Sequence, residues 1–145
     1  MIALGCDGAG YDLMQTVKAH LDKRNTPYMC FGAESNGPSD FPLFAQHVAA
    51  AVLDGRCDKG IVICGTGIGI SIAANRFGSI RCALCHDVFS AKATREHNNS
   101  NMLAMGGRVI GPGLACEIVD AWLDTQFSHA ERHQRRIDMI EVTNA

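Results

Sequence analysis

The stretch VICGTGIGISIAAN, residues 62–75, decides the fold of this chain. It begins inside an apolar run, GIVIC at 60–64, which is typical of a strand covered on both faces. Three glycines at alternate positions follow, and after them come small and apolar residues in helical spacing. The stretch therefore predicts a buried strand, a tight turn, and a helix that starts at the turn.

The same alternation of short apolar runs and helical patterns extends over the whole chain. We predict strands over residues 2–6, 27–31, 60–64, 81–85 and 102–106. We predict helices over residues 10–24, 42–54, 67–77, 88–98, 111–127 and 130–142. This order predicts an α/β fold with a doubly wound five-stranded parallel sheet, helices on both faces and a C-terminal helix. We expect a single domain over residues 1–145.

The composition is that of an ordinary globular domain and limits the classes of partner. Of the 145 residues, 47% are hydrophobic and 19% are charged, and the formal net charge is −2. Because the chain has no broad basic field, we expect neither nucleic acid nor a membrane surface as a partner. No apolar run approaches the ~18 residues of a membrane span, and the start of the chain lacks a basic segment followed by an apolar one. These features predict a cytoplasmic protein.

The seven cysteines favour a reduced protein. Most of them lie inside apolar runs, where a cysteine is usually a small buried hydrophobe. Cys82 and Cys85 form a C-x-x-C pair, but they lie in a predicted strand, where their side chains would point to opposite faces. We therefore expect free thiols, with no disulfide and no metal site.

Two of the candidate site residues lie at the carboxyl ends of predicted strands. A doubly wound sheet places its ligand site at the carboxyl ends of the strands. Asp7 follows the first strand, where a carboxylate either bonds a sugar hydroxyl or caps the next helix. Cys64 ends the third strand, immediately before the glycine-rich turn.

The GTGIG turn at 65–69 would present free backbone N–H groups at the start of a helix. Such a turn binds an anion or a developing oxyanion and lowers the pKa of a nearby thiol. It is not a Walker loop, because no Gly-Lys-Ser/Thr follows, and Ile70 stands where a dinucleotide fingerprint needs its third glycine. The alternative is a structural turn without chemistry.

Two polar clusters lie later in the chain. The segment REHNNSN at 95–101 either borders the same cleft or forms a polar helix end. The segment ERHQRR at 131–136 places Arg132 and Arg136 on one helix face. These arginines either bind a phosphate or carboxylate or form a solvated charged face. Because their helix lies beyond the sheet, it is placed to reach the site of a neighbouring subunit.

Six segments together carry a family resemblance. They are GCD (5–7), SDFP (39–42), DKGIVICGTGIGISIAANR (58–76), SIRCALC (79–85), TREHNNSNMLAMGGRVIG (94–111) and ERHQRR (131–136). From residue 2 to about 140, the chain resembles the type B ribose-5-phosphate isomerase and galactose-6-phosphate isomerase family. The resemblance implies a Rossmann-like domain that forms a homodimer or tetramer with sites shared between subunits. It also implies the interconversion of aldose and ketose phosphates without a metal or an organic cofactor.

The resemblance assigns roles to individual residues. Cys64 matches the family's base, which takes the proton from the carbon beside the carbonyl, while Ile70 stands where some members carry a glutamate instead. His97 matches the histidine that opens the sugar ring. The groups expected to hold the enediolate oxygen are Thr66 and the amides of Gly65, Gly67 and Gly69. The residues expected at the substrate are Asp7, Asp40 and Asn98. The residues expected at the phosphate are Arg108, Arg132 and Arg136, the last two in a partner's site.

Two positions depart from the family pattern. Gly8 stands where the family usually has a histidine, and Phe41 stands where it has a tyrosine. Because lost hydrogen-bonding groups change discrimination strongly, the substrate is expected to differ from ribose 5-phosphate and to be a tetrose, another pentose or a hexose phosphate. His97 favours a sugar that still needs ring opening.

Two other functions compete with the isomerase. The first is a non-catalytic sugar-phosphate or nucleotide binding protein on the same fold, with Gly8 and Phe41 as marks of lost catalysis. The second is a thiol-redox protein or hydrolase, which needs a partner for Cys64 such as Cys6 on an adjacent strand.

Overall fold

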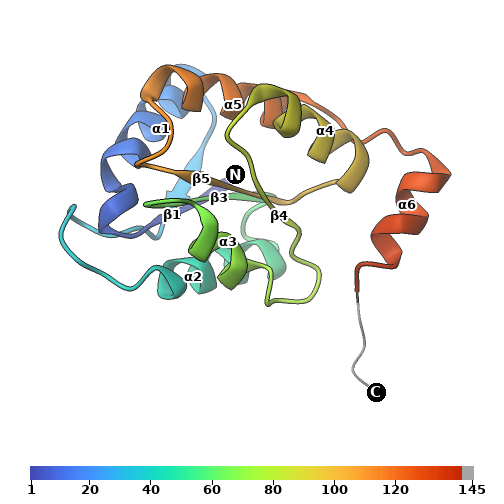
Figure 1. Ribbon diagram of the computed structural model, residues 1–145, viewed down its shortest axis with the longest axis horizontal. Coiled ribbons are helices and arrows are strands. Elements are labelled where there is room, and N and C mark those ends of the chain that lie inside the picture. The colour runs from blue at the N-terminus through green and yellow to red at the C-terminus, as the bar shows by residue number, and fades with distance from the viewer. Residues whose placement is uncertain (142–145) are drawn as a thin grey trace.

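The computed structural model describes residues 1–141 and confirms the predicted α/β architecture (Figure 1). Five parallel strands form one sheet in the order β2-β1-β3-β5-β4. The strands are β1 (Ile2–Cys6), β2 (Tyr28–Cys30), β3 (Lys59–Cys64), β4 (Cys82–Leu84) and β5 (Met102–Gly106). The α-helices are α1 (Tyr11–Lys23), α2 (Phe41–Leu53), α3 (Ile68–Ala74), α4 (Val88–Asn98), α5 (Pro112–Asp124) and α6 (Glu131–Asp138). A short 3-10 helix, η1 (Gly8–Gly10), precedes α1.

The predicted elements all exist, and the differences lie at their ends. Helix α3 ends at Ala74 rather than at 77, because the chain turns at its C-cap, Asn75, whose side chain bonds the backbone of Cys82. Helix α5 ends at Asp124, where Thr125 adopts extended backbone. Helix α6 covers Glu131–Asp138 rather than 130–142, and residue 142 of that prediction lies outside the described residues.

Helices cover both faces of the sheet and create two separate cores (Figure 1). Helices α1, α4 and α5 pack on one face, around Trp122 and Met14. Helices α2 and α3 pack on the other face, around Val48 and Ile70. No helix among residues 1–141 is long and apolar enough to cross a membrane.

Alternate residues of each strand enter different cores, and this determines which way the cysteines face. Cys6 packs in the core of α1 and α5, whereas Cys64 packs in the core of α2 and α3. Cys6 is therefore not placed to act as a partner of Cys64, and the redox hypothesis loses the partner it named. Cys82 and Cys85 also divide between the two cores, which confirms that they point to opposite faces.

The strand order places the switch point of the sheet between β1 and β3. After β1 the chain crosses one face through α1 to β2, and after β3 it crosses the other face through α3 to β4. The two connections leave in opposite directions, so a crevice opens between the carboxyl ends of β1 and β3. Asp7 and Cys64 stand on the two sides of this crevice.

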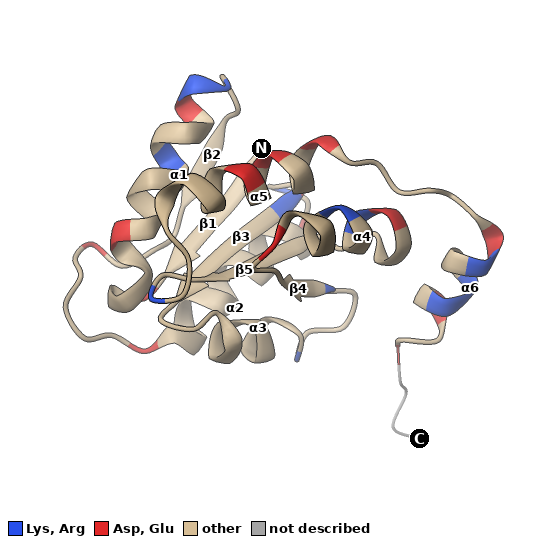
Figure 2. Cartoon of the chain, turned by 45° about the horizontal axis from the view of Figure 1, so that its top comes forward, with Lys and Arg blue, Asp and Glu red and all other residues tan. Residues whose placement is uncertain are grey.

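Helix α6 stands apart from the sheet and packs against α4 (Figure 1). Its inner side buries His133 and Ile137, while Lys and Arg residues mark α6 and the end of α4 (Figure 2). This separation from the two cores is important for the site described next.

Candidate active site

The residues after β3 form a turn that holds the Cys64 thiol against a backbone donor. Cys64 is the last residue of β3 and is only 5% exposed. The backbone N–H of Gly67 donates to Cys64 Sγ at 3.2 Å. This contact fixes the sulfur at the start of the turn. The turn and the start of α3, residues 64–69, are called the Cys64 loop below.

Gly67 is required at its position for two reasons. Its backbone lies in the left-handed region, with φ 77° and ψ −13°. A Cβ there would also stand 2.7 Å from the carbonyl carbon of Met105 and 2.6 Å from a methyl group of Leu84. The Cys64 loop therefore sits directly on the Met105–Gly106 peptide, with no room for a side chain between them.

The segment after β5 fixes the Cys64 loop by backbone hydrogen bonds. The N–H of Gly107 donates to the Cys64 carbonyl at 2.8 Å, and the N–H of Arg108 donates to the Gly65 carbonyl at 2.9 Å. The Arg108 side chain runs along the loop, with Nη1 3.5 Å from where a Cβ of Gly65 would be. Arg108 thus brings a positive charge to the mouth of the turn.

Thr66 is exposed at the tip of the Cys64 loop. Its Oγ1 accepts the N–H of Ile68 at 3.1 Å. The hydroxyl proton is not used in this contact, so it is available to donate to a bound oxygen.

Asp7 performs the capping role and keeps an oxygen for another partner. It is 8% exposed, and its Oδ1 accepts the N–H of Gly10 at 3.0 Å. Its own N–H donates to the Ile63 carbonyl at 3.3 Å, which ties the end of β1 to β3 beside Cys64. Capping and substrate binding are therefore compatible at this residue.

The loop before α2 closes one side of the crevice. Ser39 Oγ accepts the N–H of Gly8 at 2.8 Å, and a Cβ on Gly8 would lie 1.7 Å from the Gly37 carbonyl oxygen. The space of a side chain at position 8 is thus filled by backbone. The Phe41 ring covers Gly69, where a Cβ would lie 2.8 Å from the ring. Asp40 is exposed at the start of α2.

A second group of predicted residues lies on α4 and α6 and is called the α4/α6 group. Its members are all exposed: His97, Asn98, Arg132 and Arg136. Across residues 1–141, no hydrogen bond or ion pair joins this group to the Cys64 loop. The structure therefore brings together Asp7, Cys64, Gly65, Thr66, Gly67, Gly69 and Arg108, with Asp40 at the edge, and holds the other four apart.

His97 stacks on a second histidine that the sequence analysis did not single out. The rings of His97 and His133 lie 4.7 Å apart at 42°. His133 Nδ1 and Ser128 Oγ lie 2.6 Å apart. Desolvation, with Arg132 and His97 adding to it, lowers the pKa of His133. The neighbour of His97 is thus held in its neutral form.

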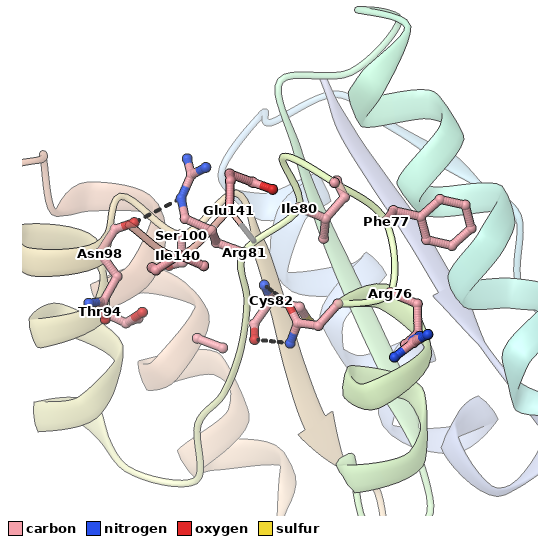
Figure 3. A pocket seen from close by; sticks show the side chains of 13 residues that line it. Arg76, Phe77, Ile80, Arg81, Cys82, Thr94, Asn98, Ser100, Ile140 and Glu141 are labelled. Carbon is pink, nitrogen blue, oxygen red and sulfur yellow. Dashed lines mark hydrogen bonds between the residues drawn. The ribbon is translucent and has the colours of Figure 1, made fainter. Parts of the chain in front are cut away.

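A cavity of about 720 Å³ lies apart from Cys64 (Figure 3). It lies between the end of α3, β4 and the end of α4. Arg81 Nε donates to the Asn98 carbonyl at 3.0 Å across one wall, and Asn75 bonds the backbone of Cys82 on another (Figure 3). These contacts hold the backbone of β4 and of the segment after α4, and they carry no group suited to proton transfer.

Three other thiols are raised in pKa by their surroundings. Burial raises the pKa of Cys6 and of Cys85 to about 11 and that of Cys82 to about 12. All seven cysteines are free. Residues 1–141 contain no cluster of three His, Cys, Asp or Glu side chains that could hold a metal ion.

Comparison with known proteins agrees with this geometry. The Ribose/Galactose Isomerase family model matches residues 2–140. Ribose-5-phosphate isomerase B of Escherichia coli (strain K12) is 48% identical over 139 residues, covering 96% of this chain and 93% of that protein. D-erythrulose-4-phosphate isomerase of Pectobacterium atrosepticum is 39% identical over 149 residues, covering 92% and 98%.

Solved structures give the same result. Ribose-5-phosphate isomerase B of Clostridium thermocellum superposes with a TM-score of 0.94 at 47% identity, over 96% of this chain and 93% of that one. The family model spans nearly the whole chain, and the three proteins compared are 39% to 48% identical to it. The chain belongs to the Ribose/Galactose Isomerase family and is an aldose–ketose isomerase of phosphorylated sugars.

Proposed function

We propose that Cys64 is the base that moves a proton between the first two carbons of the sugar phosphate. The thiolate takes the proton from the carbon beside the carbonyl, and the electron pair left behind forms an enediolate. The thiol then returns the proton to the former carbonyl carbon, and the proton of the neighbouring hydroxyl passes to the former carbonyl oxygen, which completes the isomerisation. The observation that carries this proposal is the Gly67 N–H, which donates to Cys64 Sγ at 3.2 Å at the sheet's switch point.

The developing charge on the enediolate needs donors that are already in place. We assign this role to the Thr66 hydroxyl, whose proton is free, and to the amides of Gly65 and Gly69, since the Gly67 amide expected in the same role donates to Cys64 Sγ. The backbone bonds to Gly107 and Arg108 hold this turn rigid, so the donors need not reorganise during the reaction. Asp7 Oδ2 would accept a hydroxyl of the sugar.

We assign the α4/α6 group to a site that is completed by a second copy of the chain. Four large apolar side chains surround edge strand β4 and the Cys64 loop: Ile68, Ile72, Leu84 and Phe89. Ile72 is 61% exposed and Phe89 is 81% exposed, which is costly in water. A second copy that covers this face would bring its own α4/α6 group to the Cys64 loop. His97 would then open the ring, Asn98 would contact the sugar, and Arg132 and Arg136 would bind the phosphate alongside Arg108.

The substrate is expected to be shaped by the loop before α2. The Gly37 carbonyl occupies the space of a side chain at position 8, and Phe41 offers no hydroxyl to the crevice. The site thus lacks two polar contacts on this side, and removing a hydroxyl partner changes discrimination strongly. The relatives act on both a five-carbon and a four-carbon phosphate, as their names state. We propose a sugar phosphate other than ribose 5-phosphate as the preferred substrate.

We also place the enzyme in the cytoplasm, where free thiols such as its seven cysteines persist. Each chemical step proposed here is performed by side chains and backbone groups of the chain itself.

The test is deuterium exchange in D₂O over a panel of aldose and ketose phosphates with three to six carbons, followed by proton NMR. The wild type is expected to place deuterium beside the carbonyl of one sugar, and Cys64→Ala is expected to lose this activity. Cys116→Ser, on the distant helix α5, is the matched control. Exchange that survives in Cys64→Ala would contradict the assignment of the base. A wild type that binds sugars but exchanges none of them would favour the binding-protein alternative.

A further inference from the structure

His86 makes a hydrogen bond that the proposed chemistry does not use. It lies two residues after the end of β4 and is half-buried. Its Nε2 accepts the backbone N–H of Gly106 at 3.0 Å. An imidazole nitrogen that accepts a proton donor carries no proton itself, so this bond requires neutral His86 with its proton on Nδ1.

The sheet explains why a side chain is needed at this point. Strand β4 pairs with β5 from Cys82 to Leu84, opposite Met102 to Ala104, and Cys85 N–H still donates to the Ala104 carbonyl. Strand β5 continues to Gly106, beyond the last pair. The Gly106 N–H therefore has no backbone acceptor on β4, and the His86 ring takes the place of the missing strand. Without it, a buried donor would be left unpaired.

Gly106 is the residue on which the Cys64 loop rests. It pairs with Cys64 across β3 and β5. A Cβ on Gly106 would lie 2.6 Å from the Thr66 carbonyl oxygen, so the two backbones are in direct contact. The next two N–H groups, of Gly107 and Arg108, donate to the carbonyls of Cys64 and Gly65. A shift of the Gly106 peptide would move both the thiol and the donors around it.

We propose that His86 is a positioning residue of the isomerase, which holds the Gly106 peptide so that Cys64 and the amides of its loop keep their geometry. The inference rests on the proposed function, because the loop must be catalytic for its position to matter. His86 does not reach the reacting atoms and acts through Gly106 alone. Asp87, the next residue, is engaged in capping α4 through Ser90 and leaves the ring to this bond.

The position of the acceptor suggests a matched pair of variants. In His86→Gln, the side-chain oxygen can occupy the place of Nε2. In His86→Asn, the side chain is also polar, but its oxygen is one bond closer to the backbone and corresponds to Nδ1. If the acceptor at Nε2 is what counts, the Asn variant loses function and the Gln variant regains it.

We expect His86→Asn to lower kcat by about 10- to 100-fold, because a small misplacement of catalytic groups has effects of this size. We expect KM to stay within about twofold, since the groups assigned to phosphate binding are untouched. His86→Gln should recover most of the lost kcat. Asn101→Leu is the control: Asn101 also binds backbone of the β4 segment through its side chain, at Arg81 and Ser79, but at the opposite end of the strand. It should lower the melting temperature and leave kcat unchanged.

The experiment includes Cys64→Ala in the same deuterium-exchange assay. If Cys64→Ala is inactive and the Asn and Gln variants both keep wild-type kcat, the role of His86 is wrong and the proposed function stands. If both His86 variants lose stability and activity in proportion, His86 is merely structural. The same conclusion follows if Asn101→Leu loses activity together with stability. If Cys64→Ala keeps its activity, the proposed function fails and the inference about His86 fails with it.

Discussion

The Cys64 loop and the α4/α6 group both carry expected chemical roles but are built in opposite ways. The Cys64 loop is fixed by backbone bonds to Gly107 and Arg108 and lies at the switch point of the sheet. The α4/α6 group consists of exposed side chains at the end of α4 and on α6, the helix that stands apart from both cores (Figure 1). The difference matches the tasks that we propose: proton transfer needs rigid geometry, whereas phosphate capture and ring opening are assigned to exposed side chains of a second subunit.

The largest effect is expected from removing the thiol. Cys64→Ala should lower the turnover by roughly 10²–10⁴-fold, the usual contribution of a positioned acid–base group. The substitution removes only a sulfur from a buried strand end, so the fold should remain. Steady-state kinetics together with circular dichroism measure both effects. A folded Cys64→Ala variant that still isomerises at the wild-type rate would contradict the assignment of proton transfer to the Cys64 loop.

The next effect separates ring opening from proton transfer. His97→Asn should lower the conversion of a cyclic aldose phosphate by about 10²-fold, since one acid–base group is lost. Ribulose 5-phosphate cannot close a five-membered ring, because its O5 carries the phosphate. Solvent exchange at its first carbon therefore needs Cys64 alone. We expect His97→Asn to keep this exchange and Cys64→Ala to lose it. Equal loss in both variants would show that the α4/α6 group also takes part in proton transfer.

A smaller effect tests the rigidity of the Cys64 loop. Gly67→Ala and Gly55→Ala both place a side chain at positive φ, at +77° and +84°. Gly55 has open space around it, whereas a Cβ on Gly67 meets the Met105 backbone at 2.7 Å. Strain of the backbone alone costs about 1 kcal/mol, so the Gly55 variant should lose roughly this much of its free energy of unfolding. The Gly67 variant should lose more and should also lose turnover, as urea unfolding and kinetics would show.

The smallest effect lies in a cluster that touches neither region. His20 of α1 and Arg24, which follows that helix, bind Asp120 of α5 at 2.6 Å each. Burial acts to raise the pKa of Asp120, but the hydrogen bonds from His20 and Arg24 outweigh it and lower the pKa. When folding lowers the pKa of a carboxyl, the resulting stability is fully present above the pKa of the unfolded state. It is lost as the pH falls through the pKa of the folded state.

Because Asp120 is 41% exposed, solvent screens this cluster, and its contribution should be well below about 1 kcal/mol. Asp120→Asn should flatten the acid side of the stability curve slightly and leave kcat unchanged. The free energy of unfolding, measured from pH 3 to pH 7, gives the stability curve, and the exchange assay gives kcat. A marked loss of kcat would show that the α1–α5 packing acts on the site.

The local pattern predicted the Cys64 loop because its signals are neighbours in the chain. An apolar run, alternate glycines and helical spacing within 62–75 are enough to place Cys64 at the end of a strand. Asp7 was predicted on the same basis. The sequence left open whether Asp7 caps the next helix or binds a sugar hydroxyl. The structure shows the cap, because Oδ1 accepts the N–H of Gly10, and leaves Oδ2 available for the sugar.

Contacts between distant segments could not be predicted in this way. Ser39 meets Gly8 across 31 residues, and His86 meets Gly106 across 20, and neither pair has a local signal. His133 stacks on His97 only because α6 folds back on α4. His86 follows the strand predicted over 81–85, but no local pattern indicates its bond to Gly106.

The central claim is that the Cys64 loop of one subunit works with the α4/α6 group of another. Cys64→Ala and His97→Asn would be unfolded together, refolded as an equal mixture, and assayed on a cyclic aldose phosphate, with native mass spectrometry to count mixed dimers. Random pairing of two symmetric subunits makes half the dimers mixed, each with one intact site, so activity should recover to about a quarter of the wild type. Mixed dimers that form without any recovery would contradict the account.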